Sequence, residues 1–376
     1  MAWTERYVSA SASGFDNGTS ESAPWTLQQA ASGTTAGMRV NIKAGTYTLT
    51  TNLNITTTQS GTATDAVWWR GYKTTVGDLD EKFTGDKTAG TDIPTILTTD
   101  FGYFFINGTD FFHMSGLDFK SESANYSAIY DRADYSWRKN CRFYHSVQTT
   151  NEANDQAGTN KTYINCEFSG QSASSTVYQL TDASNYSTYI NCVFYGITPN
   201  SWNGVTTSTV SNAFIGCVFQ NMRTAITANG VVLVKNCTFV DISDTAIQFA
   251  STNIVCGSVV ANNIFHDVTN YAIGSGSVNE GVMVYNNLYK SVGTRFQNMG
   301  DMPEFDGMAE VAASSFENKA IGNYQLASDS TGIGVGLGGF WPYPMADFSD
   351  VGAAQSEATS AVGGIKPVSF NGGMNG

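Results

Sequence analysis

Two aspartates, Asp241 and Asp267, are the best candidates in this 376-residue sequence for chemistry by paired side chains. Each lies two residues after a phenylalanine of a recurring phrase, Phe239 in one case and Phe265 in the other. If the phrases stack as strands, the two carboxyl groups lie about 5 Å apart. Like charges at that distance raise one pKa, so the pair could transfer protons or hold a cation. The alternative is structural: both aspartates end strands at a solvated corner, where Asn221 takes the equivalent place.

The densest charged cluster runs from Asp131 to Lys139 and includes Trp137 and Arg138. The tyrosines around it are Tyr126, Tyr130 and Tyr135. Such a cluster could grip a sugar, because aromatic rings stack on sugars and charged side chains make bidentate hydrogen bonds. A lateral loop that contacts other subunits is the equal alternative.

A further set of charges, Asp118, Arg142 and Glu167, occupies successive outward slots of the recurring phrase. Alternating charges of this kind form a surface ion ladder, worth about 0.5 kcal/mol per pair. A catalytic Arg–Glu pair is the alternative reading. The histidines of the sequence are His113, His145 and His266. They share no metal-ligand spacing, and no phosphate-binding loop or nucleophile elbow is present, so we expect neither a metal nor a cofactor.

The elements that must position these residues repeat along the chain. Aromatic residues recur at intervals of 20 to 26 residues, each at the end of a phrase such as NCRF, NCEF or NCVF. These aromatics are Phe119, Phe143, Phe168, Phe194, Phe219, Phe239, Phe265 and Tyr289. A unit of this length cannot bury its apolar side alone, so the repeats must stack on one another.

The composition of the repeats predicts strands. They are rich in Val, Ile, Thr, Phe and Tyr, are punctuated by Asn, Gly, Ser and Asp, and lack long amphipathic windows. We therefore predict a parallel β-helix with one repeat per rung. Alternate side chains share a face, so Cys141 and Phe143 should point inward and Arg142 outward. The predicted internal sulfur column comprises Cys141, Cys166, Cys192, Cys217 and Cys237. Asparagines before the cysteines should occupy a corner, because Asn tolerates left-handed backbone.

These phrases resemble those of the right-handed parallel β-helix superfamily typified by pectate lyases and phage tailspikes. The opening YVSASASGFDNGTSESAPWTLQQAAS, followed by GMRVNIKAGTYTL, is similar to the first strand, polar loop, capping helix and first rung of such proteins. WWRGYK and PTILTTDFGYFFINGTDFFHMSGLDF look like the next rungs, and NYQLASDSTGIGVGL and DFSDVGAAQ resemble closing phrases. The resemblance covers roughly residues 5–355. It implies an all-β fold, and a fold of this kind hosts many functions.

The resemblance and the composition together divide the chain into three segments. Residues 1–35 should form a strand and a short capping helix, and residues 36–355 the β-helix, with an irregular closing part from about residue 301. Residues 356–376 form a Gly-rich tail that is either disordered or docked on a neighbouring subunit. Ile365, Val368 and Phe370 are the apolar anchors for such docking.

The bulk properties exclude several classes of partner. A net charge of −13 argues against nucleic-acid binding, which needs a basic face. There is no apolar run of 18 residues, so we expect no membrane span. The first residues lack the basic and apolar regions of a secretory signal. The regular spacing of the cysteines indicates packed thiols rather than disulfides, which fits folding in a cytoplasm.

The outward slot changes from charged to mostly apolar after Glu167. It then reads Val193, Val218, Thr238, Ile264 and Leu288. An apolar stripe of this length exceeds what a monomer usually leaves bare. Either the C-terminal region covers it or a partner subunit does. We favour a partner, because the phage proteins that the sequence resembles are commonly trimers about an axis along the β-helix.

These observations predict a non-enzymatic bacteriophage virion protein, made in the host cytoplasm without a signal peptide. It would be a capsid decoration, fibre or spike component, a homotrimer that contacts the major capsid or a tail protein. One alternative is a tailspike-like polysaccharide lyase or glycoside hydrolase, with Asp241 and Asp267 or the cluster at residues 131–139 as its site. The other is a glycan-binding adhesin without turnover.

Overall fold

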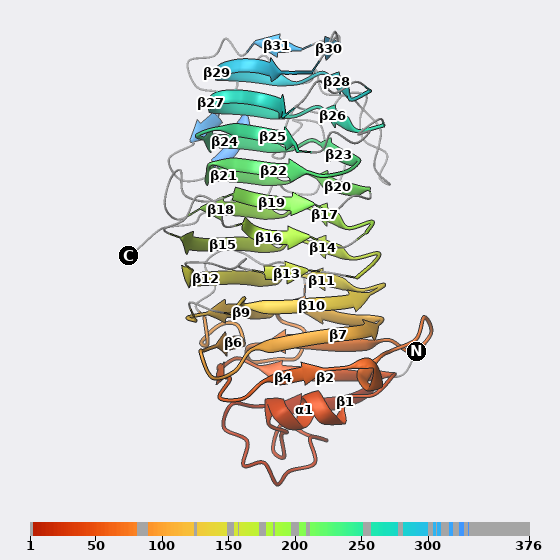
Figure 1. Cartoon of the computed structure of the whole chain (residues 1–376). Coiled ribbons are helices and arrows are strands. Elements are labelled where there is room, and N and C mark those ends of the chain that lie inside the picture. The colour runs from red at the N-terminus through yellow and green to blue at the C-terminus, as the bar shows by residue number, and fades with distance from the viewer. Residues whose placement is uncertain are drawn as a thin grey trace, which may run out of the picture.

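The chain winds into a right-handed parallel β-helix closed at its N-terminal end by a short helix, as the repeats predict (Figure 1). Each rung contributes strands to three faces that run the length of the coil. The computed structural model describes residues 3–80, 89–123, 126–148, 154–156, 158–172, 178–182, 185–196, 203–207, 211–250, 257–276, 281–299, 304–305, 307–309, 316–318, 323–326 and 330.

Face 1 is a sheet of 12 parallel strands in the order in which the chain forms them. Its strands are β1 (Thr4–Val8), β2 (Met38–Lys43), β5 (Val67–Tyr72), β8 (Phe112–Ser115), β11 (Trp137–Lys139), β14 (Thr162–Ile164), β17 (Thr188–Ile190), β20 (Asn212–Ile215), β23 (Val232–Lys235), β26 (Val259–Ala261), β28 (Met283–Tyr285) and β30 (Glu304–Phe305).

Faces 2 and 3 share a 19-stranded sheet, because β27 and β29 run on from one face to the other. Face 2 comprises β3 (Thr46–Thr48), β6 (Thr95–Thr98), β9 (Asp118–Ser121), β12 (Arg142–Gln148), β15 (Glu167–Ser172), β18 (Val193–Gly196), β21 (Val218–Met222), β24 (Thr238–Ile242), β27 (Ile264–Ser275), β29 (Leu288–Gln297) and β31 (Met308–Ala309). Face 3 comprises β4 (Leu53–Ile55), β7 (Phe104–Asp110), β10 (Ile129–Asp134), β13 (Asn154–Gln156), β16 (Tyr178–Asp182), β19 (Asn203–Thr207), β22 (Thr224–Ala228) and β25 (Thr245–Phe249), and a 3₁₀ turn, η1 (Thr57–Gln59), follows β4.

The predicted internal columns are confirmed. The rings of Phe168, Phe194 and Phe219 stack with centroids 4.7 Å apart and planes within 5° of parallel. A second column from face 1 meets them edge-on, as where Tyr189 lies 5.8 Å from Phe194. The five column cysteines are buried and unpaired, and Cys256 lies outside the described residues. Burying one such ring stabilises the fold by about 1.5–3 kcal/mol, so each ring of the columns contributes to its stability.

The asparagine corner is also confirmed. The residue before each column cysteine adopts left-handed backbone, as in Asn140 with φ 54° and Asn236 with φ 55°. Neighbouring side chains bond along the axis: the Asn262 amide donates to Asn236 at 2.8 Å, and Asn286 donates to Asn262 at 2.6 Å. These bonds satisfy polar groups at a bend that would otherwise weaken the stack.

The first rung is closed by the helix α1 (Leu27–Gly33), where the sequence predicts a cap. Thr26 and Gln29 form a reciprocal capping box, which fixes the start of the helix. Leu27, Ala30 and Ala31 are buried against the core. The helix thereby covers apolar side chains that the lowest rung would expose.

The apolar stripe on face 2 is covered by the chain itself. An antiparallel hairpin, β32 (Phe316–Asn318) and β33 (Asn323–Leu326), lies beside it (Figure 1). Its Phe316 and Leu326 form one apolar cluster with stripe residues, and Val193 packs against that cluster. The stripe members of the cluster are Val218, Ile264 and Leu288, and Val240 of β24 belongs to the cluster as well.

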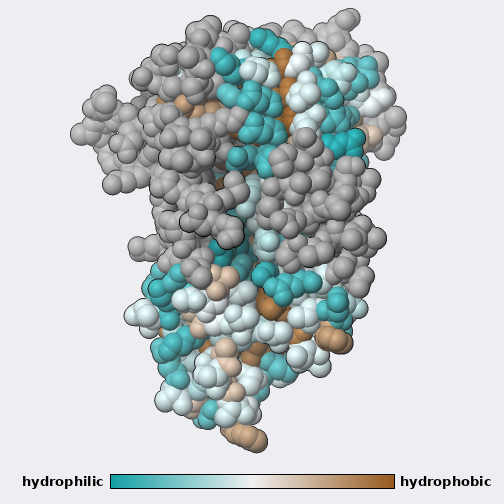
Figure 2. Space-filling view, turned by 90° about the vertical axis from the view of Figure 1, so that its left-hand side faces the viewer, coloured by the Kyte–Doolittle hydropathy of each residue, from teal (hydrophilic) through white to brown (hydrophobic). Residues whose placement is uncertain are grey.

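The preference for a partner subunit over Val218, Ile264 and Leu288 is therefore corrected, because these side chains are 3 % exposed or less within one chain. Figure 2 views this side of the molecule, where a small apolar strip is visible in the upper part between hydrophilic residues. Outside the described residues lie Ile365, Val368 and Phe370. Among the residues described, there is no helix with the length and apolarity needed to traverse a bilayer.

Candidate functional site

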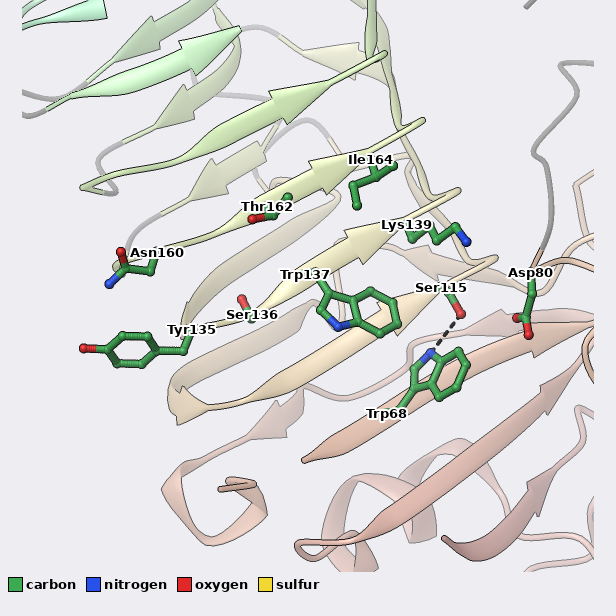
Figure 3. A pocket seen from close by; sticks show the side chains of 10 residues that line it. All are labelled: Trp68, Asp80, Ser115, Tyr135, Ser136, Trp137, Lys139, Asn160, Thr162 and Ile164. Carbon is green, nitrogen blue, oxygen red and sulfur yellow. Dashed lines mark hydrogen bonds between the residues drawn. The ribbon is translucent and has the colours of Figure 1, made fainter. Parts of the chain in front are cut away.

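A groove of about 590 Å³ opens on the outer side of face 1, over strands β5, β8, β11 and β14 (Figure 3). Outward positions of these strands form its floor. The floor residues are Trp68, Ser115, Trp137, Lys139, Thr162 and Ile164. Tyr135 and Asn160 border it at the corner before face 1, and Asp80 borders it at the other end of the strands.

Trp137 is held in place from below and from the side. Its ring stacks on the imidazole of His113 at 4.7 Å with an angle of 15°. The backbone N–H of Trp137 donates to Nδ1 of His113 at 3.3 Å, so the imidazole proton is on Nε2. Burial, and then the charge of Arg138, lower the pKa of His113 to about 3. His113 is therefore neutral at ordinary pH and keeps accepting this bond.

The ring of Trp68 contacts several other side chains of the protein. Its ring meets Trp137 edge-on at 5.4 Å, and its indole N–H donates to Ser115 at 2.9 Å. The guanidinium of Arg70 lies over its ring at 5.0 Å and that of Arg39 at 5.4 Å. Trp68 thus fixes the edge of Trp137, and the other side of Trp137 faces the groove (Figure 3).

The carboxylate of Asp80 at the groove is held in an ion pair. Both oxygens of Asp80 accept from Arg70, with Nε at 2.9 Å and Nη2 closer still. Lys139 extends along the floor from β11 (Figure 3). A carboxylate in a bidentate ion pair is poorly placed to move protons, whereas an ammonium, amides and hydroxyls around an aromatic face suit hydrogen bonding to a sugar.

The cluster at residues 131–139 does not act as one surface, which corrects the prediction. Asp131 and Arg138 lie in the interior with no exposed surface. Arg138 donates to both carboxylate oxygens of Asp131 at 2.8 Å, and Lys161 lies 3.6 Å from one of them. Burial alone raises the pKa of Asp131, but Arg138 and Lys161 together lower it below its ordinary value.

The remaining residues of that cluster are divided between the groove and another face. Tyr135, Trp137 and Lys139 line the groove, as a sugar-binding reading of this segment requires. Tyr130, in contrast, projects from face 3, where its ring meets Tyr103 at 5.5 Å. Tyr135 is 51 % exposed and has left-handed backbone with φ 47°, a strained conformation for a bulky residue that places its ring at the rim.

The ladder of Asp118, Arg142 and Glu167 has the predicted register, but it is not a surface feature. Arg142 is in register with Asp118 and Glu167 on the two adjacent strands, and its Nη2 lies 3.4 Å from Asp118. Only 4 % of the Asp118 side chain is exposed. Burial raises the pKa of Asp118 and of Glu167, and Arg142 opposes the shift in both. The single guanidinium of Arg142 thus stabilises the charged form of both Asp118 and Glu167.

Asp241 and Asp267 occupy equivalent places on adjacent rungs, as predicted. Both have φ 54°, and Asn221 with φ 59° precedes them in the same corner. Short polar side chains tolerate this left-handed bend, which gives the aspartates a structural role. Oδ2 of Asp267 also lies 3.1 Å from Nδ1 of its neighbour His266.

Two residues that contact Trp137 at the groove, Trp68 and His113, are absent from the sequence-based candidates. The segment WWRGYK is recognisable as a rung, and alternation from its buried Trp69 places Trp68 outward. An outward Trp in a strand, at a position where Thr or Lys is expected, is the feature of the sequence that indicates the groove at Trp68. His113 is marked only by its register with Trp68, which adjacent strands create.

Comparisons with known proteins identify the fold. No family model matches the sequence, and no curated protein sequence matches it. The pectate lyase Pel9A matches the structure with a TM-score of 0.56 and 13 % identity, over 93 % of this chain and 95 % of that one. ORF18 of Geobacillus virus E2 matches with a TM-score of 0.46 and 13 % identity, over 76 % of this chain and 56 % of that one. A rhamnogalacturonan lyase matches at 0.46 and 11 %, over 84 % and 91 %.

The fold is thus the pectate-lyase-like parallel β-helix. Most of the matched structures are polysaccharide lyases and other carbohydrate-active enzymes, and a phage protein is among them. At these identities the likeness concerns the fold alone, because one fold carries many functions.

Proposed function

We propose that this chain is a non-enzymatic component of a bacteriophage virion whose β-helix carries a glycan-binding groove on face 1. The observation that supports binding is the groove itself, in which an immobilised Trp137 lies among side chains that donate and accept hydrogen bonds. Asp80, the acid of the groove, is held by Arg70, which favours binding over turnover. Rigid sites on strands hold such side chains in one geometry, which lowers the entropic cost of binding.

The virion setting is supported by the interior of the coil. Five thiols stacked in the core without disulfides suit a protein that folds in a reducing cytoplasm, where phage particles are assembled. The expected homotrimer is part of the proposal, although the stripe on face 2 needs no partner for its burial. Mass spectrometry of purified particles tests the setting, and native mass spectrometry tests the trimer.

A glycan array tests the groove. The full chain should bind at least one glycan and release no shortened or unsaturated product from it. Trp137→Ala should lose the binding, and Tyr130→Ala on face 3 is the matched control that should keep it. Absence of binding to every glycan on an array that includes bacterial surface polysaccharides contradicts this function.

A second candidate, a polysaccharide lyase or hydrolase, is favoured by the ladder on face 2. Asp118 and Glu167 both have raised pKa values beside one arginine, an arrangement that can supply an acid and a base. This candidate predicts release of reducing ends or unsaturated sugars by the native chain and their loss in Glu167→Gln. Activity that survives Glu167→Gln excludes the ladder as its site.

A further inference from the structure

The residue Trp137 is held by three contacts. It is partly exposed, yet one face stacks on His113, one edge meets Trp68, and its backbone N–H is bonded to the same imidazole. Trp3 continues the aromatic row at 6.1 Å from Trp68. Aromatic contacts at these distances restrain the ring at the cost of surface that could have been buried elsewhere.

The row of rings ends at Trp137. The outward position in register with it on β14 is Thr162, and on β17 it is Thr188. These small side chains leave open the space beside the ring, and in Figure 3 Lys139 lies on one side of Trp137 and Thr162 and Asn160 lie on the other. A flat ligand of the size of one sugar ring can therefore lie on Trp137 and reach hydrogen-bonding groups at its edges.

We infer that Trp137 is the stacking platform for a single pyranose ring and that His113 is its positioning residue. The inference rests on the proposed function and names the site within it. The ligand class is a pyranose with several axial C–H groups on one side, because only such a sugar offers an apolar face to the indole. Lys139 and Asn160 then bond to its equatorial hydroxyls or to a carboxylate or acetamido substituent.

The roles of the two residues differ. Trp137 contacts the sugar, whereas His113 lies beneath the ring and acts only through it. Its Nδ1 accepts from the backbone of Trp137, so a substituted ring without that nitrogen keeps the stacking and loses the bond. His113→Phe therefore separates the stacking contact from the hydrogen bond, while His113→Ala removes both.

The test uses the full chain labelled with ¹⁵N at tryptophan and does not require knowledge of the natural glycan. The probes are the methyl pyranosides of glucose, galactose, mannose, N-acetylglucosamine and glucuronate, each added at high concentration. The indole resonance of Trp137, assigned by its absence in Trp137→Phe, should shift with at least one probe. Trp25, which packs against α1, supplies the internal control that should not shift.

The best probe should bind about tenfold more weakly to Trp137→Ala, as expected when one central aromatic contact is lost. His113→Ala should also weaken it, and His113→Phe should restore most of the affinity. Thr162→Trp, which fills the open space, should abolish binding while the chain remains folded. An unshifted Trp137 resonance with every probe, or unchanged affinity in Trp137→Ala and Thr162→Trp, overturns the inference. If the native chain binds array glycans that Trp137→Ala loses, while no pyranoside shifts the Trp137 resonance, the proposed function stands and only the assignment of a single pyranose is wrong.

Discussion

Replacing Arg138 by Met is the sharpest perturbation of the interior of this fold. The guanidinium is fully buried and donates to both oxygens of Asp131 at 2.8 Å. It also donates to the carbonyl of Phe112 at 2.6 Å, which ties two neighbouring rungs together. Removing one partner of a buried ion pair leaves the other uncompensated and costs about 3–5 kcal/mol. We expect Arg138→Met to lower the free energy of unfolding by that amount at pH 7, measured by equilibrium denaturation with guanidinium chloride.

The stabilisation by the ion pair between Asp131 and Arg138 should depend on pH. The folded-state pKa of Asp131 lies below its ordinary value, so the ion pair stabilises the protein above about pH 4, the unfolded value. That contribution is lost as the pH falls through the folded-state pKa. The difference between the native chain and Arg138→Met should therefore shrink below about pH 4.

A matched variant removes the whole cluster. When Asp131→Leu and Lys161→Met are added to Arg138→Met, no buried charge of the cluster remains, and most of the lost stability should return. A loss below about 1 kcal/mol in Arg138→Met, or a loss that does not change with pH, refutes the reasoning.

Four other outcomes follow from the structure. Glycan binding should be constant between about pH 5 and 8, because His113 has a pKa of about 3 and stays neutral there; a titration in this range that halves the affinity contradicts it. Glu167→Gln should be more stable than the native chain at pH 8 and equal to it below about pH 4, because the raised folded-state pKa makes ionisation costly only above the unfolded value. Phe316→Asp should release the hairpin and expose the stripe on face 2, seen as self-association in native mass spectrometry; a monodisperse variant that binds no hydrophobic dye argues against the cover. In a Cys256→Ala background, the thiols should resist alkylation until the chain unfolds, and rapid labelling of the folded chain would place them outside the core.

The columns were predictable because a β-helix repeats by translation. A residue that faces inward in one rung faces inward in the next, so the spacing from Cys141 to Cys166 and from Phe143 to Phe168 defines the core without any knowledge of long-range contacts. The asparagine before four of the five column cysteines was recognisable for the same reason, and Gly216 precedes Cys217.

The misplacement of Arg138 has a specific physical cause. Counting alternate residues back from Cys141 places Lys139 inward and Arg138 outward. Asn140, which lies between Lys139 and Cys141, has φ 54°, and this left-handed corner reverses the alternation. Arg138 is therefore buried and Lys139 reaches the groove. Alternation is reliable within a strand and fails across a bend.

The groove and the covered stripe depend on contacts that no local pattern encodes. The stacking of the rungs places β5 and β11 on either side of β8, and Trp68 and Trp137 meet across that strand. Long connections separate the three strands in the sequence. Phe316 covers Ile264 through a hairpin formed after the last rungs. The sequence indicates that each of these residues is apolar, but not which surface it covers.

The most direct test of the account compares the native chain with Trp137→Ala on one glycan array and then incubates the retained glycans with the native chain. The native chain should retain a defined set of glycans whose masses are unchanged after incubation, and Trp137→Ala should retain none of them. Shortened glycans, or a variant that retains the same set, would contradict it.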